Sequence, residues 1–512
     1  MKILEKLLQD KNIQKLIESI RSNSNGLFCG VTDEILPNLI SVLDRDFYFV
    51  IMPTEKKAMD LSKTLEQYNI SVDYFPPRDK VYYNLKIIND ENMNDRLRVI
   101  RELIYEETHF VVMSLSTFLD ENIKSSVYKE HIIKFERGKV FDLENLFKLL
   151  TESGYKRVSS IETKGEYSFR GGILDIYPPS AENLFRVEFF DDEVDTIRMV
   201  DSESKLSTEF IDSCEIFPAI EIIIDDDDKA KIIDGINVEL SGKNEDAVEK
   251  FNKIIEALNY GGLEGEREIF FEYLDDDKRS HIYEDFKRKV IFYDPVYAHK
   301  EYESRNEFFD FEYKNLFEQG EVLNTRPIEK RKVDFYSTRL NANYIEYMEQ
   351  EIPVNVNANE INLKDAERFS RDYLELFKRA TELRDDGYDV SLIASDAKKL
   401  DALKEAATDL GIRYSTKEED ADNVKIYISN LRNGFINSDI KLAVFGDLNI
   451  FGASNKGRKK AKKKSSKLRL QDISKGDYVI HEEHGIGIYN GVTTLEIKDV
   501  KKDYLEVLRK II

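Results

Sequence analysis

The residues between Gly30 and Pro37 begin like a phosphate-binding loop and then depart from that pattern. The stretch consists of Gly30, Val31, Thr32, Asp33, Glu34, Ile35, Leu36 and Pro37. A phosphate-binding loop follows G-x-x-x-x-G-K-[ST], in which glycines let backbone N–H groups approach the phosphates and the lysine meets their charge. Here Ile35, Leu36 and Pro37 replace the second glycine, the lysine and the hydroxyl residue.

Two acidic residues of the loop argue further against nucleotide binding. Asp33 and Glu34 place carboxylates where phosphates would lie, and like charges repel at short range. We therefore expect a turn that enters a helix, without bound ATP. The sequence shows neither a Ser-His-Asp spacing nor an intact phosphate loop, so we predict no catalytic residue and no cofactor in this chain.

Histidines, cysteines and acidic runs give no metal-binding pattern. The six histidines form no metal-spaced set with Cys29 and Cys214. We interpret His481 and His484 as turn and strand-end residues, because no further ligands converge near them. The run Asp225–Asp228 lacks regular ligand spacing and predicts a solvated loop. We expect no metal site.

The overall composition indicates a large, acidic protein of several domains. A chain of 512 residues exceeds what a single core supports, so we expect about three to five domains. A net charge of −23 argues against a surface that coats nucleic acid, and confines any such contact to a local basic patch. Two distant cysteines and no apolar run of about 20 residues favour a reduced, cytoplasmic protein without a membrane span.

The first 125 or so residues predict a parallel α/β sheet, because apolar runs alternate with helical patterns. The expected strands are Leu27–Gly30, Tyr48–Met52 and Phe110–Met113, and the expected helices are Ala58–Tyr68 and Asn92–Tyr105. From about residue 128 the sequence pattern changes to short strands separated by turns. Phe185–Phe190 and Val194–Val200 are two such strands, and the pattern indicates a β-rich insertion. A further α/β segment contains the strand Val390–Ala394 and a helix that begins near Asp396 and ends at Gly411.

The last part of the sequence contains a basic run and a short β-rich tail. Residues 455–469 include nine Lys or Arg and almost no apolar residue, which predicts a flexible linker. After it, Gly476–His481, Gly487–Leu495 and Tyr504–Leu508 predict three strands of a small β-barrel. Three strands do not close a barrel, so we expect the module to be incomplete.

Two stretches carry a resemblance to a known family. Gly165–Pro179 reads GEYSFRGGILDIYPP and Phe185–Asp195 reads FRVEFFDDEVD. Gly476–Tyr489 reads GDYVIHEEHGIGIY and Gly491–Glu496 reads GVTTLE. The first pair resembles the signature of the bacterial transcription-repair coupling factors (Mfd) and, more distantly, of the excision-repair protein UvrB. The second pair resembles the CarD-like module with which the same factors contact RNA polymerase.

Together with the changes in composition, the resemblance divides the chain into six segments. They are 1–127, the first part of a UvrB-like α/β domain; 128–217, a β-rich UvrA-binding insertion; 218–335, the second part of the UvrB-like domain; 336–452, an α/β domain; 453–469, a basic flexible linker; and 470–512, a CarD-like (Tudor-like) β-barrel module that we expect to be incomplete. The fold class that follows is multi-domain α/β, with a degenerate phosphate-loop domain that carries a β-rich insertion.

The resemblance implies an adaptor that links stalled RNA polymerase to the UvrA-dependent nucleotide excision repair machinery. Its partners would be UvrA, the RNA polymerase β subunit and, weakly, DNA through the basic linker. Full-length members of the family also translocate on DNA with ATP and magnesium, as helicase-like hydrolases. That motor would follow the polymerase-binding module, and we expect that it is not encoded in these residues.

The resemblance also assigns binding residues by motif. Arg170, Arg186 and Phe190 match family positions that contact UvrA, and Leu495 matches a position implicated in binding the polymerase β subunit. A buried barrel leucine is the alternative for Leu495.

Strand alternation gives an independent view of this assignment. In Phe185–Phe190, Val187 and Phe189 share one face of the strand, so Phe190 lies on the opposite face. An outward aromatic beside an arginine is the composition of an interface hot spot, whereas a sheet packed on both faces would put Phe190 in a second core. By the same parity Arg170 would share a face with Leu174 and Ile176, unless Gly171-Gly172 forms a bulge.

Two other functions remain open from the sequence. The chain could be a nucleic-acid-binding protein that uses residues 456–469 as a phosphate clamp, although the run lacks interleaved aromatic residues. It could also be a UvrB-like excision-repair subunit. That function would need an intact phosphate loop and a long Tyr-rich hairpin, whereas the sequence offers only Tyr82-Tyr83.

Overall fold

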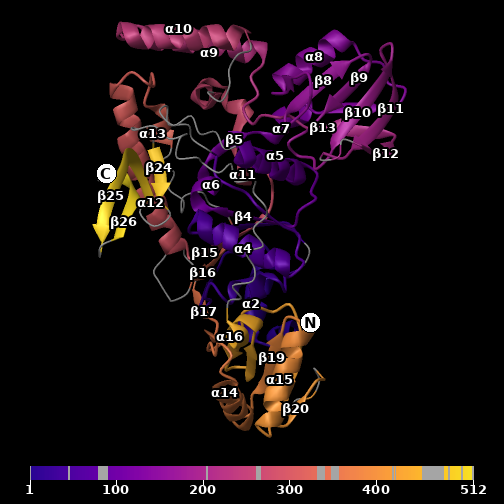
Figure 1. The fold of residues 1–512 in the computed structure, drawn as a ribbon, viewed down its shortest axis with the longest axis vertical. Coiled ribbons are helices and arrows are strands. Elements are labelled where there is room, and N and C mark those ends of the chain that lie inside the picture. The colour runs from indigo at the N-terminus through magenta and orange to yellow at the C-terminus, as the bar shows by residue number, and fades with distance from the viewer. Residues whose placement is uncertain are drawn as a thin grey trace. The chain divides into compact units, whose positions relative to one another are not determined.

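The computed structural model divides the chain into two compact units, Met1–Gly452 and Ala453–Ile512 (Figure 1). It describes residues 2–43, 46–78, 90–202, 204, 206–260, 267–330, 341–346, 357–417, 420, 422–452, 478–481, 485–497 and 500–509. In the second unit the description covers the backbone. The basic linker 453–469, the pair Tyr82-Tyr83 and His484 lie outside the described residues.

A seven-stranded parallel sheet forms the frame of the first α/β domain. Its strands follow the order β17-β1-β16-β15-β2-β4-β3. They are β1 (Gly26–Cys29), β2 (Tyr48–Met52), β3 (Val72–Tyr74), β4 (Phe110–Ser114), β15 (Lys289–Tyr293), β16 (Ala342–Glu346) and β17 (Ala358–Glu360). Phe49 and Ile51 join one core cluster while Tyr48 and Val50 join another, so both faces of the sheet are buried. The predicted α/β class with a parallel sheet is confirmed.

Helices α4 (Glu55–Gln67) and α5 (Asp90–Ile104), which flank this sheet, begin and end close to the predicted positions. Helix α2 (Lys11–Arg21) was not predicted. The Thr54 hydroxyl caps α4 by accepting from the Lys57 N–H. The two strands β16 and β17 belong to this sheet although the sequence placed them in the segment 336–452. The local sequence pattern could not show which sheet these two strands join, because parallel strands pair across long sequence separations.

A six-stranded sheet lies within the predicted insertion, and its order is β12-β11-β10-β9-β8-β7 (Figure 1). Its strands are β7 (Lys156–Arg157), β8 (Glu166–Arg170), β9 (Ile173–Ile176), β10 (Leu184–Phe190), β11 (Glu193–Val200) and β12 (Ser207–Ile211). Helix α8 (Leu143–Glu152) packs Leu146 and Leu150 against one face, together with Val187 and Phe189 of β10. A two-stranded ribbon of β6 (Ile133–Glu136) and β13 (Ser213–Ile216) completes this core.

A third sheet, of mixed direction, is found in the second α/β region. Its order is β18-β22-β23-β19-β21-β20. The strands are β18 (Leu363–Asp365), β19 (Asp389–Ala394), β20 (Tyr414–Ser415), β21 (Val424–Ile428), β22 (Phe435–Asn437) and β23 (Leu442–Phe445), and the main helices are α14 (Tyr373–Asp385) and α15 (Ala397–Asp409). Asp396 caps α15 as predicted, and Gly411 follows the helix with a φ of 67°.

The run Asp225–Asp228 is not the solvated loop that we predicted. Asp225 is the N-cap of α9 (Asp226–Leu240), and its carboxylate accepts the Asp228 N–H at 2.8 Å while Asp228 accepts the Asp225 N–H. Carboxylates are favoured there because the N-terminus of a helix carries a partial positive charge. The prediction was wrong because it compared only two alternatives for the acidic run, a solvated loop and a metal site, and did not consider a helix N-cap.

The second unit contains a three-stranded antiparallel sheet with the order β24-β25-β26. The strands are β24 (Tyr478–His481), β25 (Gly485–Ile497) and β26 (Val500–Arg509). All three were predicted, although β25 and β26 are longer than expected. Leu495 lies in β25, paired with Lys502 of β26.

The remaining elements are short, apart from two long helices. They are α1 (Lys2–Leu7), α3 (Leu36–Ile40), α6 (Leu115–Leu119), α7 (Ser125–Glu130), α10 (Glu245–Tyr260), α11 (Ile282–Asp285), α12 (Pro295–Glu318), α13 (Arg326–Lys330), α16 (Asp447–Phe451), β5 (Glu121–Ile123), β14 (Arg279–His281) and the 3₁₀ turns at Arg267–Tyr273 and Asp276–Lys278. Within the described ranges, no helix combines the length and the apolar character that a bilayer crossing requires.

Candidate protein-binding surface

The turn between β8 and β9 decides which side chains share the outward face of the six-stranded sheet. Gly171 and Gly172 form a two-residue turn with φ values of 57° and 81°, the left-handed region that glycine adopts without strain. This turn pairs Arg170 with Ile173. Directly opposed residues of an antiparallel pair share a face, so Arg170 lies on the face opposite to the buried Leu174 and Ile176. The parity prediction for Arg170 was therefore wrong, because it counted through the turn as if β8 and β9 were one strand.

Strand β10 directs alternate residues to the core and to solvent, as predicted. Val187 is fully buried and Phe189 is 9% exposed, whereas Phe190 is 81% exposed. The alternative of a second core around Phe190 is therefore wrong. Packing on the outward face is confined to the other end of β10, where Leu184 is buried with Val200 in a small cluster.

Two ion pairs fix arginines on the outward face. Arg186 donates from Nε and Nη2 to Asp175 at 2.7 and 2.9 Å. Arg198 donates from Nη2 to Glu188 at 2.9 Å. The hydrogen bond that Arg186 donates to Asp175 raises the pKa of the Arg186 guanidinium above its ordinary value. Each guanidinium is therefore held in one orientation before any partner arrives, which lowers the entropy cost of a contact.

The predicted residues Arg170, Arg186 and Phe190 thus lie on one face of one sheet. Arg170 is exposed, Arg186 is half-buried in its ion pair, and Phe190 has the largest exposed fraction among the exposed large apolar side chains of the described residues. An exposed aromatic next to oriented arginines suits binding of another protein, because such side chains dominate interface energetics.

Comparison with known proteins places this sheet in a recognised domain. Residues 133–221 match the model of the UvrB interaction domain, and residues 473–508 match that of the CarD-like/TRCF RID domain. The transcription-repair-coupling factor of Bacillus subtilis is 26% identical over 97% of this chain and 45% of its own length. That of Haemophilus influenzae is 22% identical over 92% of this chain and 42% of its own length. The resemblance to transcription-repair coupling factors is confirmed.

The chain spans less than half the length of these coupling-factor relatives. The match to the UvrB interaction domain includes every strand of the six-stranded sheet, and therefore includes Arg170, Arg186 and Phe190. The match to the second domain model includes β24, β25 and Leu495. The structure describes the backbone of Leu495 and not its side chain. The two predictions for Leu495, a barrel core residue and a polymerase contact, both stay predictions.

Sequence reasoning missed three outward residues of the same sheet, Ile173, Arg198 and Phe210, and also the exposed Leu206, which directly precedes β12. Their exposed fractions are 37% for Ile173 and 68% for each of Leu206 and Phe210. The register of the β10–β11 and β11–β12 hairpins brings Arg198 opposite Arg186 and Phe210 opposite Arg198. The Asp191-Asp192 turn was visible in the sequence, but the register shifts by one residue between Glu188 and Phe189. Counting outward from the turn would therefore have paired Arg186 with Ile197 and missed Arg198.

The Gly30–Pro37 loop uses its backbone donors inside the protein. The N–H groups of Gly30 and Val31 both donate to the carbonyl oxygen of Glu346, at 3.0 and 3.2 Å. Gly30 has a φ of 94°, and a Cβ added there would lie 2.2 Å from the Ile361 oxygen. The glycine therefore serves close packing of this loop against the residues after β17, and the donors that cradle phosphates elsewhere are occupied.

The acidic residues of the loop are also paired within the protein. Lys57 Nζ lies 2.9 Å from an oxygen of Asp33, and Arg368 pairs with Glu34. The Thr32 hydroxyl donates to Asp365. The two cations partly neutralise Asp33 and Glu34, so the predicted repulsion of phosphate is weaker than expected. The argument against phosphate binding that remains is that polar groups of the loop already have partners inside the protein.

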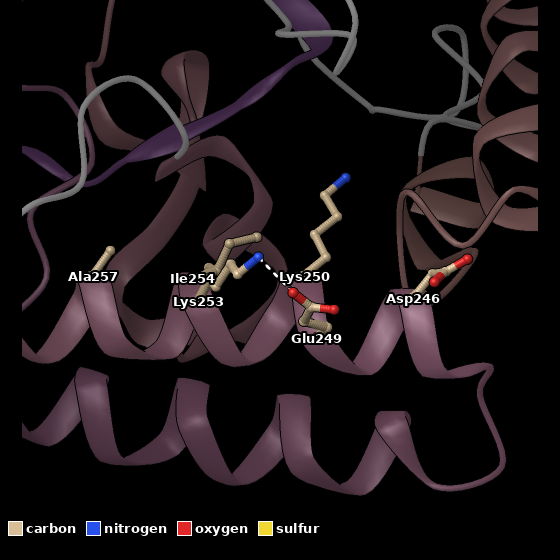
Figure 2. A pocket seen from close by; sticks show the side chains of 6 residues that line it. All are labelled: Asp246, Glu249, Lys250, Lys253, Ile254 and Ala257. Carbon is tan, nitrogen blue, oxygen red and sulfur yellow. Dashed lines mark hydrogen bonds and ion pairs between the residues drawn. The ribbon is translucent and has the colours of Figure 1, made fainter.

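A groove of about 460 Å³ runs along α10 (Figure 2). It is lined by Asp246, Glu249, Lys250, Lys253, Ile254 and Ala257. Two carboxylates, from Asp246 and Glu249, are followed along it by two ammonium groups, from Lys250 and Lys253, and Lys253 donates to Glu249 at 2.7 Å (Figure 2). This arrangement of mixed charge favours no ligand class.

Buried thiols and acidic clusters add no reactive centre. Cys29 and Cys214 are both buried, and burial raises the pKa of the Cys214 thiol to about 12. Across the part of the chain that the structure describes, no group of three or more His, Cys, Asp or Glu could hold a metal ion.

Proposed function

We propose that this chain is the adaptor part of a transcription-repair coupling factor. In this proposal the outward face of the six-stranded sheet binds UvrA, and the module 470–512 binds the RNA polymerase β subunit. The order of the two domain matches, 133–221 and then 473–508, supports the proposal because one chain then carries both contacts. Transcription and excision repair of bacterial DNA share one compartment, so the proposed role is cytoplasmic.

The observation that carries the UvrA contact is the exposure of Phe190 on the same face as Arg170 and Arg186. An isolated protein gains nothing from a phenylalanine that is 81% exposed, since its apolar surface stays in water. A partner that covers this ring removes that surface from water. Arg170 and Arg186 would then pair with carbonyl or carboxylate oxygens of UvrA around the covered ring.

The polymerase contact is proposed for the terminal module. Strands β24, β25 and β26 would be part of a small β-barrel of the CarD type, with Leu495 of β25 at the contact with the polymerase β subunit. Hydrogen exchange over residues 478–509 tests the barrel. Exchange as slow as in β2 or β4 would support a closed module, and rapid exchange throughout would contradict one.

We propose no catalytic role and no bound ATP for residues 1–512. The occupied N–H groups of Gly30 and Val31 and the missing lysine of the loop support this. The ATP-dependent translocation that the resemblance implies for full-length factors would require a phosphate loop with its lysine. DNA contact is proposed to be weak and confined to residues 456–469, where nine positive charges predict a strong dependence on salt.

Titration of purified UvrA into the chain tests the central proposal. We expect binding without DNA and without polymerase, and a loss of about thirtyfold in affinity for Phe190→Ala, equivalent to about 2 kcal/mol. A parallel titration with RNA polymerase should respond to Leu495→Ala and not to Phe190→Ala. Absence of UvrA binding by the parent chain would contradict the proposal.

A further inference from the structure

The outward face continues beyond the three residues that the family resemblance singles out. Hydrogen-bonded pairing places Asp175 opposite Arg186, Arg186 opposite Arg198, and Arg198 opposite Phe210. These four residues form one row across β9, β10, β11 and β12, which are neighbours in the sheet (Figure 1). Opposed residues of antiparallel strands share a face, so the row lies on the same side as Phe190.

The end of this row carries a second exposed phenylalanine, Phe210. Phe210 lies on the edge strand β12 and is 68% exposed. The Arg198 guanidinium lies over its ring at 4.7 Å from the centroid, which is within the range of a cation–π contact. Glu188 fixes Arg198 from the opposite side at 2.9 Å. A second exposed aromatic on this face is therefore held in place by an oriented arginine.

The size of a stable interface gives a reason for this second aromatic. A standard protein–protein interface covers about 800 Å² on each partner, equivalent to a disc roughly 30 Å wide. Strands β8 and β10 lie two strand spacings apart, or about 10 Å, so Arg170, Arg186 and Phe190 span a small part of such a disc. Including β11 and β12 brings the width across the strands to about 19 Å.

We propose that Arg198 and Phe210 form a second anchor of the UvrA interface, roughly 17 Å from Phe190 as judged from strand spacing and rise. This inference rests on the proposed function and commits to the same partner. UvrA would cover the ring of Phe210 with apolar groups, as it covers Phe190. The partner is the same because the row that ends at Arg198 and Phe210 also contains Arg186, which belongs to the first anchor.

The ion pairs of the row predict which side chains contribute most to UvrA affinity. Asp175 and Glu188 already neutralise Arg186 and Arg198, so the net charge that the row presents is small. Affinity then comes mainly from covering the two rings, while the arginines set orientation. The loss caused by Phe210→Ala should therefore change little between low and moderate salt, since apolar burial is not screened.

The test is a titration of UvrA with the full chain and four variants. They are Phe190→Ala, Phe210→Ala, the double variant, and Phe308→Ala as a control. Phe308 is 52% exposed on α12, outside the sheet, and so reports the effect of removing an exposed phenylalanine elsewhere. We expect about tenfold weaker binding for Phe210→Ala, unchanged binding for Phe308→Ala, and a double variant that loses the product of the two single effects, because the sites are well separated.

The possible outcomes separate this inference from the function on which it rests. Weaker binding by both Phe190→Ala and Phe210→Ala, with unchanged thermal midpoints, supports the second anchor. Weaker binding by Phe190→Ala alone overturns the second anchor and leaves the proposed function intact. No UvrA binding by the parent chain overturns both.

Discussion

The Gly30–Pro37 loop and the outward face of the six-stranded sheet differ in what remains available to a partner. Both contain charged groups that the protein pairs internally, Asp33 with Lys57 in the loop and Arg186 with Asp175 on the sheet. In the loop the backbone donors are occupied as well, and Val31 and Ile35 are fully buried. On the sheet the pairs stand next to an aromatic ring that is 81% exposed, Phe190.

Internal pairing of charges therefore does not distinguish a structural region from a binding surface. The distinguishing feature is apolar area left in water beside groups that are already oriented. The loop lacks the lysine of a phosphate-binding loop and uses its Gly30 and Val31 N–H groups internally, whereas the sheet keeps its aromatic groups uncovered. Five experiments test this contrast.

Charge reversal at Arg186 should give the largest effect. In Arg186→Glu the new carboxylate would face Asp175 and would repel the oxygens that the arginine is proposed to meet, so UvrA affinity should fall by more than about a hundredfold, or roughly 3 kcal/mol. Titration measures this. Lys459→Glu in the basic linker is the matched control and should change affinity little, and equal affinities for parent and Arg186→Glu would place the contact elsewhere.

The neighbours Phe189 and Phe190 should differ in their effect on folding. Phe189→Ala removes a core ring that is 9% exposed and should lower the free energy of unfolding by about 3 kcal/mol. Phe190→Ala should change it by less than about 0.5 kcal/mol, because the ring is in water in the folded state. Denaturant unfolding of the two variants provides the comparison. Similar losses in the free energy of unfolding would contradict the assignment of Phe189 to the core face and Phe190 to the solvent face of β10.

Gly30→Ala should destabilise the first domain without affecting UvrA binding. The added Cβ would meet the Ile361 oxygen at 2.2 Å, and the φ of 94° is unfavourable for alanine, so a loss of about 2 kcal/mol is expected. Gly242→Ala is a matched control, since its φ is 84° and nothing lies within 4 Å of its added Cβ. Thermal unfolding should rank Gly30→Ala well below Gly242→Ala.

Glu346 should make folding stability depend on pH. Its side chain is fully buried, one carboxylate oxygen accepts the Val296 N–H at 3.2 Å, and burial raises the pKa of the carboxyl to about 7. Because this pKa is higher in the folded state, the contribution of Glu346 is complete below about pH 4 and is lost as pH rises through about 7. Glu346→Gln should flatten that decline in unfolding experiments between about pH 5 and 8, and an unchanged slope would contradict the assignment.

ATP should give no effect. Calorimetric titration with ATP and magnesium is expected to show no heat of binding, because the loop donors are used internally. Micromolar affinity that is lost in Gly30→Ala, with the variant still folded, would show that the loop binds nucleotide. An ATPase assay with and without DNA gives the corresponding test of catalysis.

The sequence predicted those elements whose signal is local. Strand β2 begins and ends at the predicted residues, Tyr48 and Met52, because a strand buried on both faces reads as one apolar run. Strand β16 was missed because its sequence, Ala-Asn-Tyr-Ile-Glu, includes Asn343 and Glu346. Both polar residues are buried, and their hydrogen bonds to distant segments cannot be read from neighbouring residues.

The candidate surface was predictable in part for the same reason. Alternation within β10 fixed the sides of Phe189 and Phe190 without knowledge of any partner strand. Arg170 and Phe210 required the register of hairpins, which depends on turn conformation and pairing. Asp225 was misread because a helix cap and a solvated loop share the same residue types.

The Gly171-Gly172 turn also has a consequence for how this surface can vary among relatives. The Phe189 N–H donates to the Gly172 oxygen at 2.7 Å, and a Cβ on Gly172 would lie 3.0 Å from the Phe189 oxygen. If one inserted residue shifted the pairing of β8 by one position, the two faces of β8 would be exchanged, with Arg170 turned inward and Phe169 outward. The length and conformation of this turn therefore help to determine which side chains the face presents to a partner.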